Sequence, residues 1–185
     1  MGGVPNIPMQ PKRAPKYAGV IEINLGDKWR GVYKEGEPPK DTLVLFAIGI
    51  LVKKDKGLLV KKTTENQWNI LEGIPEKDEA TDAFLKRIAE EHAGVSVNKI
   101  LTLGHDNLKA TRHNTEYDLG TPAVRTFSLV IAETMGQIPE ESEYTRRRLP
   151  LSEYAVAVRK RYPEFTKHLG KALDQYIIMQ VKGEI

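Results

Sequence analysis

The stretch WNILEGIPEKDEATDAFLKRIAEEHAGV, residues 68–95, decides how the chain is expected to fold. An apolar start leads to Gly73, an acidic loop over residues 74–79 follows, and periodic apolar positions predict a helix from about Ala80 to His92. Gly94 is placed to end that helix, because glycine adopts the left-handed C-cap conformation at low cost. The stretch therefore predicts a strand, a loop and a helix in succession.

The spacing of its glycines and charges resembles the Nudix box, whose pattern is Gly-x5-Glu-x7-Arg-Glu-U-x-Glu-Glu-x-Gly-U with U a bulky aliphatic residue. The positions that match are Gly73, Glu79, Arg87, Glu91, Gly94 and Val95. Ile88 and His92 stand where the pattern has glutamates, and Ala89 replaces an aliphatic residue. The resemblance thus keeps the frame of the box and loses two of its carboxylates.

This resemblance implies an α+β fold, a Nudix-like α/β/α sandwich with a mixed β-sheet between helices. Apolar runs typical of buried strands lie at residues 42–52, 58–62, 100–104 and 125–133. Residues beyond 143 are expected to be helical, and a one-sided apolar stripe from about Pro163 to Ile177 predicts a helix packed on the sheet.

The first 40 residues are expected to form a unit of their own ahead of a Nudix-like domain at residues 41–185. Residues 1–16 hold four prolines and three basic side chains, which predicts an extended arm. Residues 17–34 read as two short strands around a turn, a β-hairpin. The arm has either no role or a partner contact, and a homodimer formed through it is one such contact.

Composition limits the classes of function. The chain has 185 residues, a net charge of +3 and no cysteine, which excludes disulfides, thiolate zinc sites and cysteine nucleophiles. Without a membrane-spanning apolar run or a secretion signal near its start, we expect a cytoplasmic protein that does not enter a membrane. The basic runs at 146–148 and 159–161 lack interleaved aromatic residues, which disfavours nucleic-acid binding.

Positions 88, 91 and 92 lie on one face of a helix, so a complete box would direct three carboxylates at one point. The resemblance implies Mg²⁺ or Mn²⁺ there, since such hard cations bind carboxylates and bridge a pyrophosphate. The candidate metal ligands in this chain are Gly73, through its carbonyl, Glu91, His92 and Glu72. The resemblance also implies an ion pair between Glu79 and Arg87 that holds the loop against the helix. An ordinary amphipathic helix covering a sheet is the alternative, and it needs no metal.

With one box carboxylate left, further catalytic groups would come from the polar stretch between His105 and Pro122, which is expected to be a loop. The candidate catalytic residues are Glu91, His105 and His113, and the candidates for binding substrate phosphates are Lys109, Arg112 and Arg125. The box is also similar to that of GDP-mannose mannosyl hydrolases, which lose the glutamate after the arginine and use a loop histidine as base. Those enzymes keep the final glutamate, where this chain has His92.

Three functions are compatible with these residues. The first is a metal-dependent Nudix-type hydrolase of a nucleoside diphosphate linked to another group. The second is a catalytically inactive Nudix-fold module that binds a nucleotide, an RNA end or a protein partner. The third is a structural subunit without a ligand. The first two share a nucleotide-derived small molecule as the expected partner.

Overall fold

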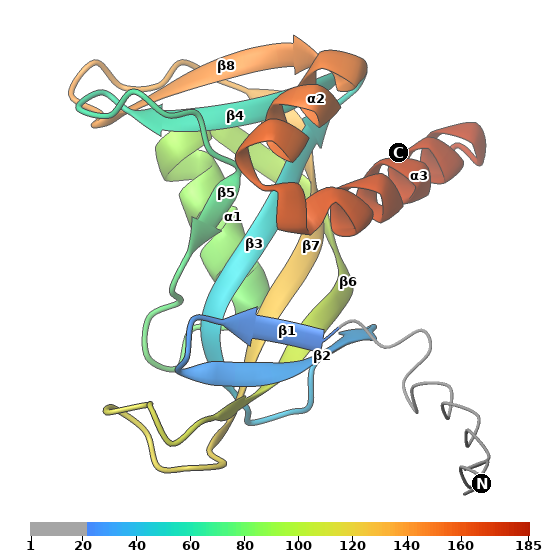
Figure 1. Ribbon diagram of the computed structural model, residues 1–185. Helices are drawn as coiled ribbons and strands as arrows, with labels where there is room; N and C mark the ends of the chain where they lie inside the picture. Colours follow the sequence, from blue (N-terminus) through green and yellow to red (C-terminus); the bar gives the residue numbers. More distant parts are fainter. Residues whose placement is uncertain (1–21) are drawn as a thin grey trace, which may run out of the picture.

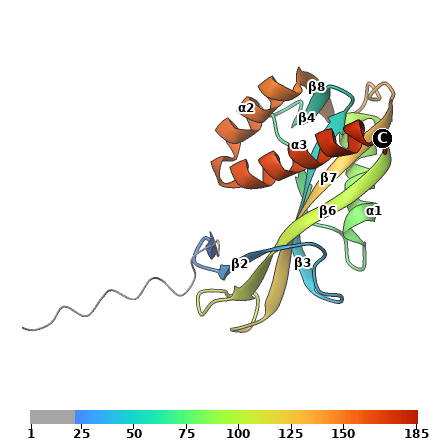
Figure 2. The same ribbon diagram turned by 90° about the vertical axis from the view of Figure 1, so that its right-hand side faces the viewer.

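The computed structural model describes residues 22–185, which form one β-sheet with helices on both faces (Figure 1, Figure 2). The strands are β1 (Glu22–Leu25), β2 (Trp29–Glu35), β3 (Leu43–Lys53), β4 (Lys56–Lys62), β5 (Leu71–Gly73), β6 (Val95–Ala110), β7 (Pro122–Met135) and β8 (Tyr144–Pro150). The helices are α1 (Thr81–Ala93), α2 (Leu151–Arg161), the short 3-10 helix η1 (Pro163–Phe165) and α3 (Thr166–Val181). Among these residues no helix is both long and apolar enough to cross a membrane. The predicted arm at residues 1–16 lies outside the described part of the chain.

The strand order is β1-β2-β6-β7-β3-β4-β8, and the short β5 pairs with β3. β3 and β7 run parallel, whereas the other paired strands are antiparallel. α1 packs on one face of the sheet, and α2 and α3 pack on the other (Figure 2). The predicted fold class, a mixed sheet between helices, is confirmed by this topology.

The predicted N-terminal hairpin continues the main sheet. β1 pairs with β2, and β2 runs antiparallel to β6 from Trp29 opposite Ala110 onward. The backbone of β2 approaches β6 closely at Gly31, where any Cβ would collide with the carbonyl oxygen of Asn107. The division of the chain into two units at residue 40 stays a prediction.

Alternation along β7 divides the core into two layers, because successive side chains of a strand point to opposite faces. Phe127, Leu129 and Ile131 belong to the layer beneath α2 and α3. Val130 and Ala132 belong to the layer beneath α1. Both faces of the strand are therefore buried, as its nearly continuous apolar sequence predicts.

The apolar stripe of α3 is buried at Leu169, Ala172 and Tyr176, so the helix packs on the sheet as expected. Ile177 departs from this expectation, because 49% of it is exposed. It follows Tyr176 by one residue, about 100° further around the helix, and so lies at the edge of the buried face.

The stretch expected to be a loop from His105 to Pro122 is a strand in its first part, since β6 continues to Ala110. Pairing with β2 on one side and with β7 on the other satisfies its backbone groups. Asp106 stands opposite Arg125 and forms an ion pair with it, so polar residues that are typical of a loop are accommodated within the sheet. The loop itself is confined to residues 111–121.

The expectation of helix throughout the chain beyond residue 143 is wrong, because β8 lies there and pairs with β4 at the edge of the sheet. Arg146, in the middle of β8, donates a hydrogen bond to the carbonyl of Ala93 at the end of α1 and another to that of Gly136, 3.2 Å away. These contacts give a basic residue a structural use inside a strand.

Candidate functional site

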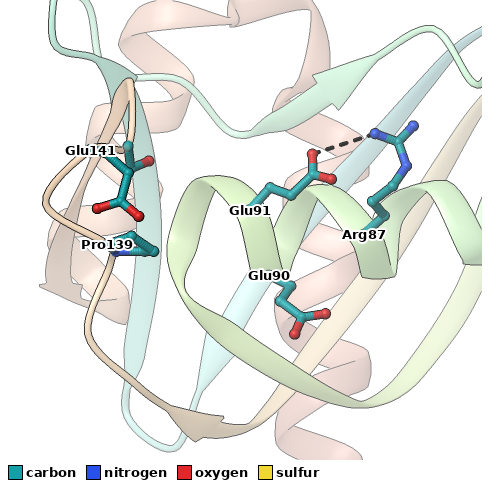
Figure 3. A pocket seen from close by; sticks show the side chains of 6 residues that line it. Arg87, Glu90, Glu91, Pro139 and Glu141 are labelled. Atoms are coloured by element: carbon teal, nitrogen blue, oxygen red, sulfur yellow. Dashed lines mark hydrogen bonds and ion pairs between the residues drawn. The ribbon is translucent and has the colours of Figure 1, made fainter.

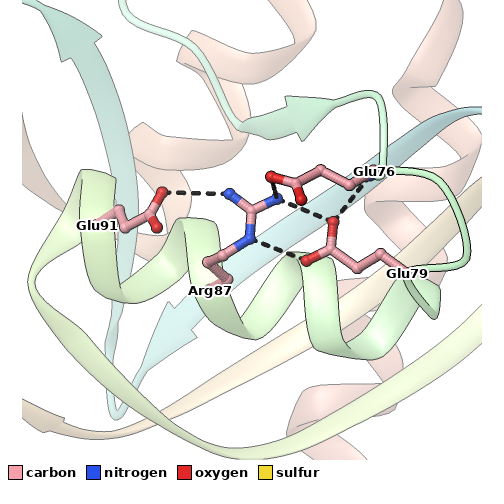
Figure 4. Close-up of polar contacts among 4 residues, drawn as sticks. All are labelled: Glu76, Glu79, Arg87 and Glu91. Atoms are coloured by element: carbon pink, nitrogen blue, oxygen red, sulfur yellow. Dashed lines mark hydrogen bonds and ion pairs between the residues drawn. The ribbon is translucent and has the colours of Figure 1, made fainter.

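Arg87 joins the acidic loop to α1. Its Nε and Nη2 donate hydrogen bonds of 2.9 Å to the two carboxylate oxygens of Glu79 (Figure 4). Glu76 lies 3.5 Å from the same guanidinium, and Glu91 lies 3.4 Å from it on the next turn of the helix. The hydrogen bonds from Arg87 lower the pKa of Glu79 to about 2. The ion pair that the sequence predicts is therefore formed, and it is bidentate.

Two glycines explain why the strand, loop and helix fold in this way. A Cβ on Gly73 would lie 2.8 Å from the ring of Phe84, so only glycine lets α1 approach the end of β5 closely. Gly94 has φ 59° and donates from its backbone N–H to carbonyls in the last turn of α1, as a left-handed C-cap does. The loop between them is closed by the backbone N–H of Glu76, which donates to the Glu79 carboxylate over 2.9 Å.

Glu91 lines a cleft of about 500 Å³ between α1 and the loop before β8. Figure 3 shows its carboxylate turned toward Arg87, with Glu141 across the cleft. Ile88, which occupies a metal-binding position of the complete box, is 3% exposed and packs in the core beneath the helix. The helix face formed by positions 88, 91 and 92 therefore lies partly in the core, and Glu91 is its only carboxylate.

The other two side chains predicted as metal ligands are engaged elsewhere. The ring of His92 stacks on Tyr144 with 3.6 Å between centroids, and burial, with the charge of Lys62, lowers its pKa to about 4. Glu72 accepts a hydrogen bond of 2.7 Å from the hydroxyl of Tyr162, the residue after α2, and burial raises its pKa. Within residues 22–185 no three His, Cys, Asp or Glu residues lie close enough to hold a metal ion. The residues present therefore do not fit the metal that the box implies.

His105 is buried within the sheet and Arg125 is largely covered, and neither lines a cleft described above or below. His105 is 3% exposed, and its Nδ1 lies 3.1 Å from the carbonyl oxygen of Gly36. Arg125 donates from Nε to Asp106 over 2.7 Å, and its guanidinium lies over the ring of Phe165 at 5.0 Å. Burial raises the pKa of Asp106, although Arg125 opposes this shift. The contacts of His105 and Arg125 are thus made to other residues inside the protein.

The remaining predicted residues come together on the 111–121 loop and the end of β6. Lys109, Arg112 and His113 line a cleft of about 430 Å³ with Arg30 of β2, and we call this the basic cleft. Arg30 stands opposite Lys109 in the β2–β6 register, and Arg112 donates from Nε to Nε2 of His113 over 3.2 Å. Sequence reasoning missed Arg30, because only the pairing of β2 with β6 brings it to this place.

The loop that carries the basic cleft is fixed by its own polar side chains. Thr111 donates from its hydroxyl to the carbonyl of Asp27 in the β1–β2 turn. The side-chain oxygen of Asn114 accepts hydrogen bonds of 3.0 Å from the backbone N–H groups of Glu116 and Tyr117. Such Asx-type contacts replace a backbone turn within the loop, and the Thr111 hydroxyl ties the loop to the β1–β2 turn. Figure 1 places this loop at the opposite end of the sheet from β8, and so away from the Glu91 cleft.

The chain is similar in part to solved structures of two other proteins. A mutant of the pyrophosphohydrolase BsRppH from Bacillus subtilis matches 65% of this chain and 72% of its own, with a TM-score of 0.47 and 16% identity. A structure from a study of MutT from Aliivibrio salmonicida and Vibrio cholerae matches 67% of this chain and 92% of its own, with a TM-score of 0.45 and 16% identity. No protein-family model and no curated protein sequence matches the chain. Because both TM-scores are below 0.5, we base no argument on these similarities.

Proposed function

We propose that the protein is a Nudix-fold module that binds a phosphate-bearing nucleotide derivative in the basic cleft. The observation that supports this proposal most is the separation of the predicted site into two parts. The side chains suited to a phosphate gather in one cleft, whereas those suited to a metal are dispersed over a surface cleft, an aromatic stack and a hydrogen bond to Tyr162. Binding without metal-assisted hydrolysis is the function that this arrangement favours.

The cations of the cleft are available to an anion. Within residues 22–185, Arg30, Lys109 and Arg112 form no ion pair with a carboxylate. An arginine offers two parallel N–H donors to phosphate oxygens, and a lysine adds a point charge. Leu119, which is exposed on the rim of the same cleft, offers apolar surface to the rest of the ligand. Because all of these charges face solvent, the affinity is expected to fall as the salt concentration rises.

Calorimetry with ADP, ATP and GDP-mannose in the presence of EDTA tests this proposal. We expect saturable binding that Arg30→Gln with Lys109→Gln weakens about tenfold, since two exposed charge contacts contribute on the order of 0.5–1 kcal/mol each. Lys86→Gln on α1 removes an exposed charge far from the cleft and serves as the matched control. Absent binding, or equal weakening by the control, would overturn the proposal.

Hydrolysis of a nucleoside diphosphate derivative is the second candidate function. The bidentate pair of Arg87 with Glu79 favours it, because the loop and helix keep the geometry of the box while Glu91 lines a cleft beside them. A screen of nucleotide sugars, dinucleotides and nucleoside triphosphates with Mg²⁺ or Mn²⁺ distinguishes the two. Turnover that Glu91→Gln abolishes would support the enzyme over the binding module.

A further inference from the structure

A second cleft of opposite character lies on the other side of β2. It has a volume of about 1030 Å³, and we call it the acidic groove. It is lined by residues 41–45 at the start of β3, by residues 74–80 before α1, by Trp29 of β2, and by Glu116 and Tyr117 of the 111–121 loop. Five of these residues are acidic and one is basic, so the groove is negative even after Arg87 and Lys28 are counted against Glu79 and Glu116.

One wall of the groove is an open strand edge. β7 pairs with β3 from Leu43 onward on one side. On the other side β5 pairs with β3 only at residues 47–49, because the chain leaves the sheet after Gly73 and enters the acidic loop. Within residues 22–185 no strand pairs with residues 43–46 on this side, and residues 43–45 of this unpaired edge line the groove. An open edge of this kind is a template for another strand.

The groove also exposes apolar side chains beside that edge. Ile74 is 67% exposed, Leu43 is 38% exposed and Tyr117 is 36% exposed. The ring of Tyr117 lies against Trp29 with 5.4 Å between centroids, which gives the far wall an aromatic surface. Exposed apolar residues gathered in one groove with a polar rim are typical of an interaction site.

We propose that the acidic groove binds an extended basic segment of a partner protein, which adds to the sheet as a strand on the open edge of β3 in line with β5. Main-chain hydrogen bonds to residues 43–46 would supply affinity for any extended peptide, and alternate side chains would supply specificity. Lysine or arginine would meet Asp41, Asp78 and Glu116, while apolar residues between them would cover Leu43 and Ile74. Four edge residues correspond to about 13 Å of strand, so about five residues of the partner suffice.

The charge of the groove selects this occupant among the alternatives. A nucleotide or another phosphate would be repelled by the carboxylates that line the groove. A second copy of the chain would have to bring a basic strand to the groove, and sedimentation tests this occupant below. The proposal does not depend on the phosphate ligand, because the two clefts have different lining residues.

Fluorescence anisotropy with a labelled synthetic peptide of alternating lysine and valine tests the proposal. Two further peptides carry N-methyl groups on the lysine or on the valine backbone nitrogens. In a strand the N–H groups of alternate residues point to the same edge, so methylation of one set removes every donor to β3 and methylation of the other set removes none. We expect one methylated peptide to lose binding and the other to keep it. Equal binding by both would overturn strand addition.

Variants of the groove test the role of charge. Asp41→Asn with Asp78→Asn should weaken the lysine–valine peptide about tenfold, and asparagine is chosen because both positions have positive φ, 58° and 65°. Asp174→Asn on the exposed side of α3 is the matched control and should change nothing. Circular dichroism checks that the variants are folded. Equal binding of a glutamate–valine peptide, or a dimer in sedimentation that the two groove substitutions dissociate, would contradict the proposal.

Discussion

The basic cleft and the acidic groove share two segments of chain and carry opposite charge. Trp29 lines the groove, and the next residue, Arg30, lines the cleft. The 111–121 loop divides in the same way, because His113 belongs to the cleft and Tyr117 to the groove. Successive residues of a strand point to opposite faces, so a short alternating sequence builds two unlike surfaces back to back.

This contrast shows what the β2 hairpin contributes to the molecule. Without β2, Lys109 would lack Arg30 beside it, and the groove would lack the aromatic wall formed by Trp29 and Tyr117. Asn114 stabilises the turn at which the loop passes from one side to the other. Any change that loosens β2 should therefore affect both clefts, and any change of a lining charge should affect one.

The largest effect is expected inside the sheet, at the ion pair of Arg125 with Asp106, whose side chains are 11% and 0% exposed. Asp106→Ala should lower the free energy of unfolding by about 3 kcal/mol, because it leaves the largely buried guanidinium of Arg125 without its partner. Urea unfolding followed by circular dichroism measures this loss. Asp106→Leu with Arg125→Met removes both charges and should recover most of it, and a double variant as unstable as the single one would show that the charge is not the cause.

Gly31→Ala should cost about 1–3 kcal/mol and weaken ligands of both clefts together. The new methyl group would meet the carbonyl oxygen of Asn107 on the paired strand, which cannot move without disturbing the β2–β6 pairing. Thermal unfolding and the two binding assays measure the effect. Gly170→Ala in α3 is the control, since nothing lies within 4 Å of the added Cβ, and it should be neutral or stabilising. Loss at one cleft alone would show that the clefts do not share β2.

Acidification should weaken the fold on the order of 1 kcal/mol between pH 6.5 and 4 through His168. Burial between Phe127 and Tyr33, with Arg125, Lys171 and Lys167 nearby, lowers its pKa from 6.5 to about 4. The unfolded chain therefore binds the proton first, and stability present above pH 6.5 is lost as the pH falls. In His168→Phe the free energy of unfolding should lose the part of its pH dependence between pH 6.5 and 4 that His168 causes. The similar contribution of His92 should remain. An unchanged pH dependence in this variant would exclude His168 as its source. Ligand binding to the two clefts is best compared above pH 6.5, where this loss of stability is absent.

The sequence predicts the loop and helix from Gly73 to Gly94 well because each landmark acts locally. Glycine caps and the eight-residue spacing from Glu79 to Arg87 depend on residues close in the chain. The extension of β6 to Ala110 and the strand β8 depend instead on partners far along the chain. Polar residues in those strands interrupt the apolar pattern by which a strand is predicted. Asp106, for example, fits within the sheet only because Arg125 on the neighbouring strand pairs with it.

The candidate site divides for the same reason. The resemblance to the Nudix box places several functional residues in one expected site, but their positions in the fold are set by sheet pairing. His105 falls on a strand whose neighbours bury it, whereas Lys109, four residues later, reaches the surface. The sequence around Arg30 and around the open edge of β3 predicts neither feature, because both depend on which strands lie side by side in the sheet.

The smallest effect is expected at Lys28, whose Nζ lies 3.1 Å from Glu116 with both side chains largely exposed. Lys28→Ala should change stability by less than about 0.5 kcal/mol, because exposed ion pairs contribute little. It should nevertheless make the groove more negative and tighten the lysine–valine peptide about twofold at low salt, a gain that about 1 M salt removes by screening. Binding of ADP in the basic cleft should stay the same. If Lys28→Ala changes the affinities of the peptide and of ADP equally, the charges of one cleft act on the other. The two clefts would then have to be described as one continuous binding surface.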